Sequence, residues 1–219
     1  MFFCNRFKNA GGMLTASKID KEVRRGNIII EPYTTDQLNP NSYNLKLYPE
    51  LKTYKVYKPA VRYDEREMIV DVNLERPDYK PYLDVKENND YETIEIPEDG
   101  YVLQPGVLYI GRTEEFTSTD KYIPMINGRS SLGRLGISVH ICAGFGDVGF
   151  SGTWTLEITA VEPVKIYPHL EIAQVCWFTA VGNPKEYLYR GRYFGQEDAT
   201  TSRSFMNKQG MWKTDVDFI

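Results

Sequence analysis

Apolar and polar residues alternate in short runs along most of the chain. Neighbouring side chains of a β-strand point to opposite faces, so this period of two is typical of strands buried on one side. Turn-forming residues such as Gln104-Pro105-Gly106 separate the runs. The runs that predict strands are NIIIEPY, SYNLKLYPELKTY, YETIEI, GYVLQPGVLYIGRT, GISVHICA, GTWTLEITAVE, VKIYP and EIAQVCWFTA. The pattern therefore predicts a mainly β (all-β) domain, either a barrel or a sandwich-like fold.

A helical period is found near the N-terminus, over residues 15–26 (TASKIDKEVRRG). Ile19 and Val23 fall on one face of this segment, as the period of an amphipathic helix requires. Thr15 or Ser17 can cap its first turn, and Gly26 can end it. The sequence thus predicts a single N-terminal helix beside the strands.

Two segments depart from the alternation. Residues 57–90 are charged and rich in turn formers, and we interpret them as an insertion that could carry a hairpin. Residues 187–219 show little periodicity, yet they hold aromatic residues and arginines. We therefore divide the chain into an N-terminal extension (1–12), one β domain (13–186) that contains the insertion, and a C-terminal tail (187–219).

Composition and charge limit the partners and the cellular compartment that we expect for the protein. The 219 residues carry a net charge of −4 and no basic stripe, so we expect no nucleic-acid partner. Three widely spaced cysteines (Cys4, Cys142 and Cys176) suggest free thiols in a reducing compartment. No apolar run approaches a membrane span, and the first residues do not resemble a secretory signal. We expect a cytoplasmic protein without a membrane partner.

Two familiar motifs fail on their context. Gly144, Gly146 and Gly149 spell G-x-G-x-x-G, but a dinucleotide fingerprint needs a helix directly after the last glycine. Here FSGTWTLEI follows, and it alternates like a strand. His169 and Glu171 match the H-x-E of zinc deaminases, but that chemistry also requires a P-C-x-x-C pair, which the chain lacks downstream. We expect no zinc, and we interpret residues 167–169 as a surface turn.

The strand after the glycines carries a carboxylate. Thr153, Thr155, Glu157 and Thr159 are predicted to share a polar face, opposite an apolar face that begins at Trp154. Before the glycines, residues 128–136 read GRSSLGRLG, a turn or short helical segment with two hydroxyls and two guanidinium groups. Hydroxyls, guanidinium groups and free N–H groups of this kind can bind phosphate oxygens.

This order of motifs resembles the dCTP deaminase branch of the trimeric dUTPase-like superfamily. The resemblance runs from about residue 14 to 203, apart from 57–90. It rests on LNPNSYNLKL (38–47), GRSSLGRLG (128–136), VHICAGFGDVGFSGTWTLEI (139–158), EIAQVCWF (171–178) and GRYFGQEDATTSR (191–203). It implies a distorted, jelly-roll-like β-barrel with one N-terminal helix. It also implies homotrimers with sites between subunits and a C-terminal tail that closes over the site.

The resemblance implies a deaminase that uses no zinc. Glu157 would act as general base on a water that attacks carbon 4 of cytosine. Ser130 and the backbone carbonyl of Ala143 would position this water, and Arg134 would hold Glu157 and stabilise charge. The nucleotide would be bound by Arg129, Ser131, Asp147, Tyr189, Arg192 and Gln196, with Asp147 on the 3′-hydroxyl, Tyr189 over the sugar or phosphate, and Mg²⁺ bound through the triphosphate.

The expected partners are dCTP, with dUTP or dTTP as product or inhibitor, and two further copies of the chain. We expect dUTP as the main product. Asp198 stands where the family usually has glycine and would repel phosphates, and Asp147 cannot easily both bind the sugar and activate a second water. Two alternatives stay open: a bifunctional enzyme that goes on to dUMP, and a regulator that senses nucleotides on the same fold. Against the regulator, a sensor needs no general base.

Overall fold

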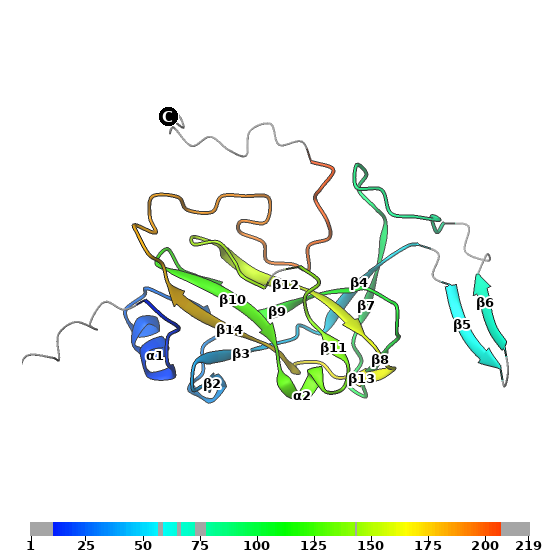
Figure 1. Cartoon of the computed structure of the whole chain (residues 1–219), viewed down its shortest axis with the longest axis horizontal. Helices are drawn as coiled ribbons and strands as arrows, with labels where there is room; N and C mark the ends of the chain where they lie inside the picture. Colours follow the sequence, from blue (N-terminus) through cyan, green and yellow to red (C-terminus); the bar gives the residue numbers. More distant parts are fainter. Residues whose placement is uncertain (1–10, 57–58, 65–66, 73–77, 143, 207–219) are drawn as a thin grey trace, which may run out of the picture.

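Two antiparallel sheets form the body of the protein in the computed structural model, which describes residues 11–56, 59–64, 67–72, 78–142 and 144–206 (Figure 1). The six-stranded sheet has the order β11-β12-β9-β4-β7, and β1 also pairs with β9. Its strands are β11 (Ile137–Ser138), β12 (Ser151–Ala160), β9 (Tyr109–Ser118), β4 (Glu50–Tyr54), β7 (Tyr91–Glu95) and β1 (Ile29–Glu31).

The second sheet has four strands in the order β10-β14-β3-β2, and smaller elements complete the fold. Its strands are β10 (Tyr122–Gly128), β14 (Glu171–Thr179), β3 (Ser42–Lys46) and β2 (Leu38–Asn39). Two further antiparallel pairs are β8 (Tyr101–Leu103) with β13 (Val164–Ile166), and β5 (Pro59–Asp64) with β6 (Glu67–Val72). The helical elements are α1 (Ala16–Arg24), η1 (Thr35–Gln37) and α2 (Ser130–Gly133).

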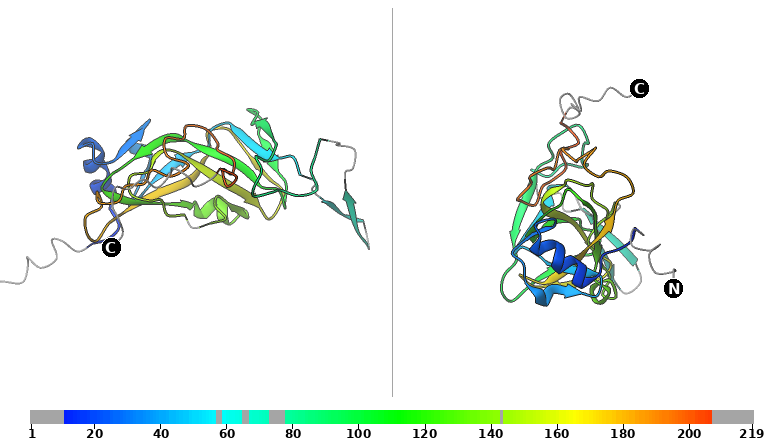
Figure 2. Two further views of the ribbon diagram at one scale, coloured as in Figure 1. Left: turned by 90° about the horizontal axis from the view of Figure 1, so that it is seen from above. Right: turned by 90° about the vertical axis from the view of Figure 1, so that its left-hand side faces the viewer.

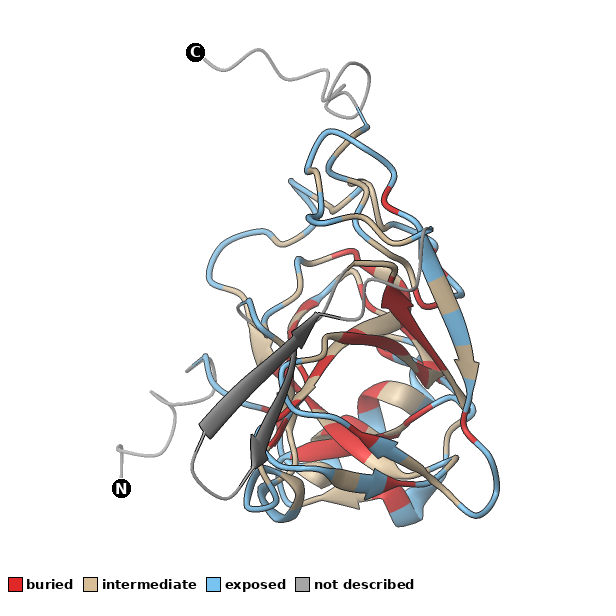
Figure 3. Ribbon diagram, turned by 90° about the vertical axis from the view of Figure 1, so that its right-hand side faces the viewer, coloured by how far each residue is buried: buried red, intermediate tan, exposed pale blue. Residues whose placement is uncertain are grey.

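The core lies between the two sheets, where apolar side chains of both are fully buried (Figure 3). Leu156 and Ile158 of β12 share one cluster with residues of β3 and β14 such as Leu45 and Trp177. The helix α1 lies at one end of the body and contributes Ile19 to this cluster (Figure 2). Among the described residues, no helix is long and apolar enough to cross a membrane.

The predicted all-β fold with one N-terminal helix is confirmed. The helix begins after Thr15, whose side chain makes no capping hydrogen bond, and Gly26 follows its end with a positive φ of 71°. The predicted hairpin in the insertion is present as β5 and β6. Two strand predictions were inaccurate. The sequence analysis did not predict β10, and of the predicted strand 136–143 only Ile137–Ser138 pairs regularly.

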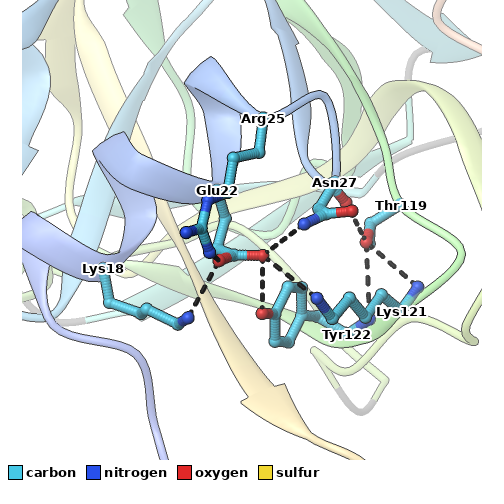
Figure 4. A network of polar contacts seen from close by, with 7 residues as sticks. All are labelled: Lys18, Glu22, Arg25, Asn27, Thr119, Lys121 and Tyr122. Carbon is cyan, nitrogen blue, oxygen red and sulfur yellow. Dashed lines mark hydrogen bonds and ion pairs between the residues drawn. The ribbon is translucent and has the colours of Figure 1, made fainter.

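A buried carboxylate joins α1 to the start of β10 (Figure 4). Glu22 is fully buried, and its Oε2 accepts hydrogen bonds from Tyr122 (2.9 Å) and Asn27 (2.6 Å). Lys18, at 2.8 Å, donates to Oε1. Burial raises the pKa of Glu22, but the hydrogen bonds from Lys18, Asn27 and Tyr122 outweigh it and hold this pKa far below its usual range. The helix is therefore fixed to the sheet by an ionised side chain.

A β-bulge interrupts the alternation of β12. The pairing of β12 with β9 shifts its register between Thr153 and Thr155. After the bulge, Leu156 and Ile158 are buried while Glu157 is half-exposed, as predicted. Before it the predicted faces are wrong, because the extra residue of a bulge reverses the side-chain direction. Thr153 is buried, and Trp154 is half-exposed.

Candidate active site

A cavity of about 750 Å³ opens beside β12 and contains the Glu157 side chain. Most of its lining comes from strands β9 and β12, the loop between β11 and β12, the C-terminal segment and a loop of the insertion, and Tyr54 of β4 and Ile126 of β10 complete it. Its walls are largely apolar or aromatic, with Phe150 and Trp154 packed at 4.4 Å between ring centres. The lining residues used below are Glu157, Thr155, Asp147, Tyr189, Gln196 and Thr200.

The loop before β12 holds the Glu157 carboxylate through its backbone. Oε2 accepts hydrogen bonds from the N–H groups of Ile141 (2.7 Å) and Cys142 (3.2 Å). The Cys142 thiol lies 4.0 Å from Oε1. Burial and the neighbouring Glu157 carboxylate raise the pKa of this thiol, which favours its protonated form. The carboxylate is thus fixed in orientation at the cavity wall, as a general base must be.

The glycines of residues 144–149 are required by close approaches within the protein. A Cβ at Gly144 would lie 2.0 Å from the Ile126 carbonyl oxygen, and a Cβ at Gly146 would lie 2.4 Å from the Trp154 ring. The loop runs along the edge of β10, where the Gly144 carbonyl accepts a hydrogen bond from the Ile126 N–H at 2.6 Å. Gly144 and Gly146 thus make room for β10 and β12, and the close approach of a nucleoside that the sequence suggested for this loop stays a prediction.

The C-terminal segment lines the cavity and pairs with β12 at the bulge. The Thr153 N–H donates to the Gln196 carbonyl (2.9 Å), and Gln196 Nε2 donates to the Thr153 carbonyl (2.9 Å). Gln196 Oε1 is buried and has no hydrogen-bond partner among the described residues. Tyr189 lines the same wall, and its hydroxyl accepts from the Tyr193 N–H at 3.2 Å.

The structure therefore brings Glu157, Asp147, Tyr189 and Gln196 together around one cavity, with Cys142 and Gly144 beside the predicted Ala143. Ala143 itself lies outside the described residues. Gln196 was predicted to bind phosphate, but one amide hydrogen already binds Thr153, and the group left without a partner in the described chain is an acceptor. An unpaired acceptor suits a hydroxyl or amino group of a ligand better than a phosphate.

The residues predicted from GRSSLGRLG lie elsewhere on the same chain. Ser130, Ser131 and Arg134 are exposed on α2 and the turn after it, and none of them lines the described part of the cavity. Arg129 forms a 2.9 Å ion pair with Glu171 of β14. Within one copy of the chain, Ser130 and Arg134 do not line the described part of the Glu157 cavity, and their roles in a site between subunits stay predictions.

Lysine and arginine side chains are absent from the described lining of this cavity. Arg192, predicted to bind phosphate, instead donates to the Met206 carbonyl at 2.9 Å. Asp198 was expected to repel phosphates at the site. Its carboxylate lies 2.6 Å from Lys52 Nζ, outside the described lining of the cavity, and this ion pair compensates its charge.

The H-x-E residues do not act together. His169 contacts Glu114 through Nδ1, whereas Glu171 binds Arg129 and accepts a hydrogen bond from Asn44 (2.9 Å). His169 is exposed in a turn with φ of 59°, as the prediction of a surface turn requires. Asn44 thus has a structural partner in Glu171.

The insertion contributes to the site, which was not predicted from the sequence. The loop of residues 83–89 lines the cavity with Leu83, Asp84, Val85 and Asn89. Asn89 is buried, and its side chain holds the loop by bonding to Asp84 N–H and carbonyl groups. The apolar pair Leu83 and Val85 within a charged segment is the only local signal that could have pointed to this wall.

Fold and cavity together define a mainly β domain whose own tail covers a carboxylate-bearing pocket. The model of the dCTP deaminase-like family matches residues 13–180, and the chain belongs to this family. A relative from Clostridium beijerinckii, "dCTP deaminase, dUMP-forming", is 42% identical over 91% of this chain and 93% of its own length. One from Clostridium acetobutylicum with the same name is 45% identical over 83% and 90%.

A solved structure supports the same fold. The 2′-deoxycytidine 5′-triphosphate deaminase of Agrobacterium tumefaciens superposes with a TM-score of 0.54 at 18% identity. The match covers 78% of this chain and 49% of that chain. At this identity the likeness shows the shared fold.

Proposed function

We propose that the protein deaminates dCTP hydrolytically and converts the product further to dUMP. The observation that carries the first step is Glu157, fixed by two backbone N–H groups at the wall of a nucleotide-sized cavity. Glu157 takes a proton from water while the water oxygen attacks carbon 4 of cytosine. Glu157 passes this proton to ring nitrogen 3. It then carries the proton of the new hydroxyl on carbon 4 to the amino group, so that the carbon 4 carbonyl forms and ammonia leaves.

The proposal of dUMP as final product reverses the order of the two products expected from sequence. The names of the curated relatives support dUMP, as does the position of Asp198. Because Lys52 neutralises Asp198 away from the cavity, the expected repulsion of phosphates no longer argues against closure around them. In the second step, water attacks the α-phosphorus and pyrophosphate leaves. We assign Asp147, exposed at the cavity, to the activation of this water in place of the contact with the 3′-hydroxyl expected from the resemblance.

We infer further that each site is completed by another copy of the chain in a homotrimer. A triphosphate needs cationic partners, and the described lining of the cavity offers no lysine or arginine from its own copy. Ser130, Ser131 and Arg134 are exposed and available to a neighbour. Arg129 and these three residues would bind phosphates, position the water and hold Glu157 across the interface.

Magnesium enters this scheme with the substrate. Mg²⁺ usually keeps phosphate oxygens and waters as ligands, so we infer that magnesium-bound dCTP is the species that binds. Among the described residues, no group of three His, Cys, Asp or Glu side chains gathers in the manner of a metal site.

Two measurements test the two chemical steps. Glu157→Gln should retain nucleotide binding and lose deamination by about 10²–10⁴-fold, the usual contribution of a general base. Substantial deamination by this variant would refute the assignment of the base. Phosphorus NMR of dCTP turnover should show pyrophosphate released in step with ammonia. Accumulation of dUTP would exclude dUMP formation while leaving the deaminase intact.

Shared sites predict complementation between two inactive variants. Glu157→Gln and Arg134→Ala, co-expressed in equal amounts, should recover about a quarter of the wild-type activity if subunits mix at random and each site uses both copies. Each variant alone is the control. Absence of recovery, together with a monomer in analytical ultracentrifugation, would exclude shared sites.

A further inference from the structure

The C-terminal segment is attached to the six-stranded sheet by a lysine that is almost fully buried. Lys52 lies on β4, and its side chain is 8% exposed. Its Nζ donates to Asp198 Oδ2 at 2.6 Å and to the Ala199 carbonyl at 2.9 Å. Both acceptors belong to the C-terminal segment. Glu50 is the other carboxylate near this ammonium, at 3.9 Å.

A buried ammonium without hydrogen-bond acceptors is strongly unfavourable. The two contacts therefore stabilise the buried charge of Lys52 and also hold the C-terminal segment on the sheet. If residues 198–199 left the sheet, Lys52 would keep the Glu50 carboxylate at 3.9 Å and the Tyr91 ring at 5.3 Å, and it would lose both of its hydrogen-bond acceptors in the C-terminal segment. The Asp198 carboxylate stays accessible, with its side chain 67% exposed. Burial raises the pKa of Asp198, but its hydrogen bond from Lys52 outweighs this and lowers the pKa. The carboxylate is therefore ionised at neutral pH.

The attachment point lies between residues that line the cavity. Gln196 precedes it and Thr200 follows it, and both belong to the cavity wall. Ala199, 2% exposed, packs with Ile110 in a small apolar cluster. The next backbone N–H, that of Thr200, donates to Thr155 Oγ1 at 3.3 Å, and Thr155 is two residues before Glu157 on β12.

We propose that Lys52 and Asp198 are positioning residues for catalysis, which anchor the C-terminal segment so that Gln196 and Thr200 stand at the nucleotide. Neither side chain needs to touch the reacting atoms. The inference rests on the proposed function for its catalytic consequence. It explains why an aspartate is useful at a position where the family motif suggested glycine, because glycine offers no carboxylate to Lys52.

The test compares Asp198→Asn with the neighbouring control Glu197→Gln. Glu197 is exposed and forms no ion pair or hydrogen bond through its side chain within the described part of the chain. The asparagine side chain of the first variant can still accept from the Ala199 N–H but lacks the charge, so folding should persist. The Ser202 N–H, two residues beyond Thr200, donates to the Tyr54 hydroxyl at 2.8 Å. We expect faster hydrogen–deuterium exchange at the Thr200 and Ser202 amides in Asp198→Asn and not in the control. Asp198→Glu should restore slow exchange.

The kinetic expectation is a rise of KM for dCTP of about tenfold in Asp198→Asn, the loss typical of one charge-assisted contact, with kcat changed much less. The proposal would be overturned if Asp198→Asn had the same exchange rates and the same KM as the wild type. It would also be overturned by faster exchange without a change in KM, or by an equal effect of Glu197→Gln. The exchange measurement does not depend on activity. If the protein fails to deaminate dCTP, the proposed function is refuted, and the exchange rates still show whether Lys52 and Asp198 anchor the C-terminal segment.

Discussion

Replacing Glu22 by glutamine should destabilise the protein because it removes the one carboxylate that joins α1 to β10 (Figure 4). Gln has nearly the same size, but an NH2 group replaces one carboxylate oxygen. This group is a hydrogen-bond donor and faces the donors that surround Glu22. The three basic partners are half-exposed, with side chains 43–54% accessible, and water can replace their contacts. Their ion pairs should each contribute no more than about 1 kcal/mol.

The larger loss comes from Tyr122, which is 3% exposed and donates to Glu22 Oε2. A buried donor left without an acceptor costs roughly 1–3 kcal/mol. Together these terms give a decrease of about 2–4 kcal/mol in the free energy of unfolding, measured by urea denaturation at pH 7. Asp20→Asn on the same helix is the control. Its partner Arg24 is exposed, and the asparagine oxygen can still accept from the Tyr33 hydroxyl (2.8 Å), so the loss should be much smaller than that of Glu22→Gln.

The dependence on pH gives a second measurement of the same network. The pKa of Glu22 is lowered in the folded protein, below its ordinary value of 4.5. Its stabilisation is therefore complete above the unfolded pKa and decreases as the pH falls through the acid range toward the folded pKa. The difference between wild type and Glu22→Gln should narrow as the pH is lowered from 6 to about 3. Equal stability at pH 7, or a gap that widens in acid, would refute the reasoning.

Three further outcomes are expected. Gly144→Ala should lower both stability and activity, because its Cβ would meet the Ile126 carbonyl at 2.0 Å, whereas Gly12→Ala, with nothing within 4 Å, should change neither measurably. Alkylation of Cys142 by iodoacetamide should be slow at pH 7 and accelerate as the pH rises, since its thiol pKa is raised; bound dCTP should slow it, and unprotected fast labelling would contradict the geometry. A zinc-selective chelator should leave turnover unchanged while removal of magnesium raises the KM for dCTP, and strong inhibition by the zinc chelator would contradict a mechanism without zinc.

Strands with clear alternation and one amphipathic helix were predictable from sequence, because each depends on a local period. The strand β10 was not, since Pro124 and Asn127 interrupt its apolar pattern. It is nonetheless paired with β14 along its whole length. The reversal at Thr153 and Trp154 also escaped prediction, because a bulge is decided by the register with β9.

Of the residues that line the cavity, those predicted from the sequence lie either in the continuous motif that contains Glu157 or in the C-terminal tail. The insertion loop was not predictable, because only the tertiary fold brings Leu83 and Val85 to the cavity and they form no recognisable motif. The effect of Asp198 was misjudged for a similar reason. A carboxylate in a sequence reveals its charge, but its partner Lys52 lies 146 positions away.

The glycine loop at residues 144–149 also limits how this site can change over evolution. Gly144 and Gly146 are held by contacts that leave no space for a side chain, while Phe145 and Asp147 beside them are exposed and line the cavity. Under the proposed function, new base or sugar preferences would arise at this wall through Phe145 and Asp147, while the backbone between them stays fixed. A library designed to accept modified cytosines should diversify Phe145 and the insertion loop, and keep the glycines constant.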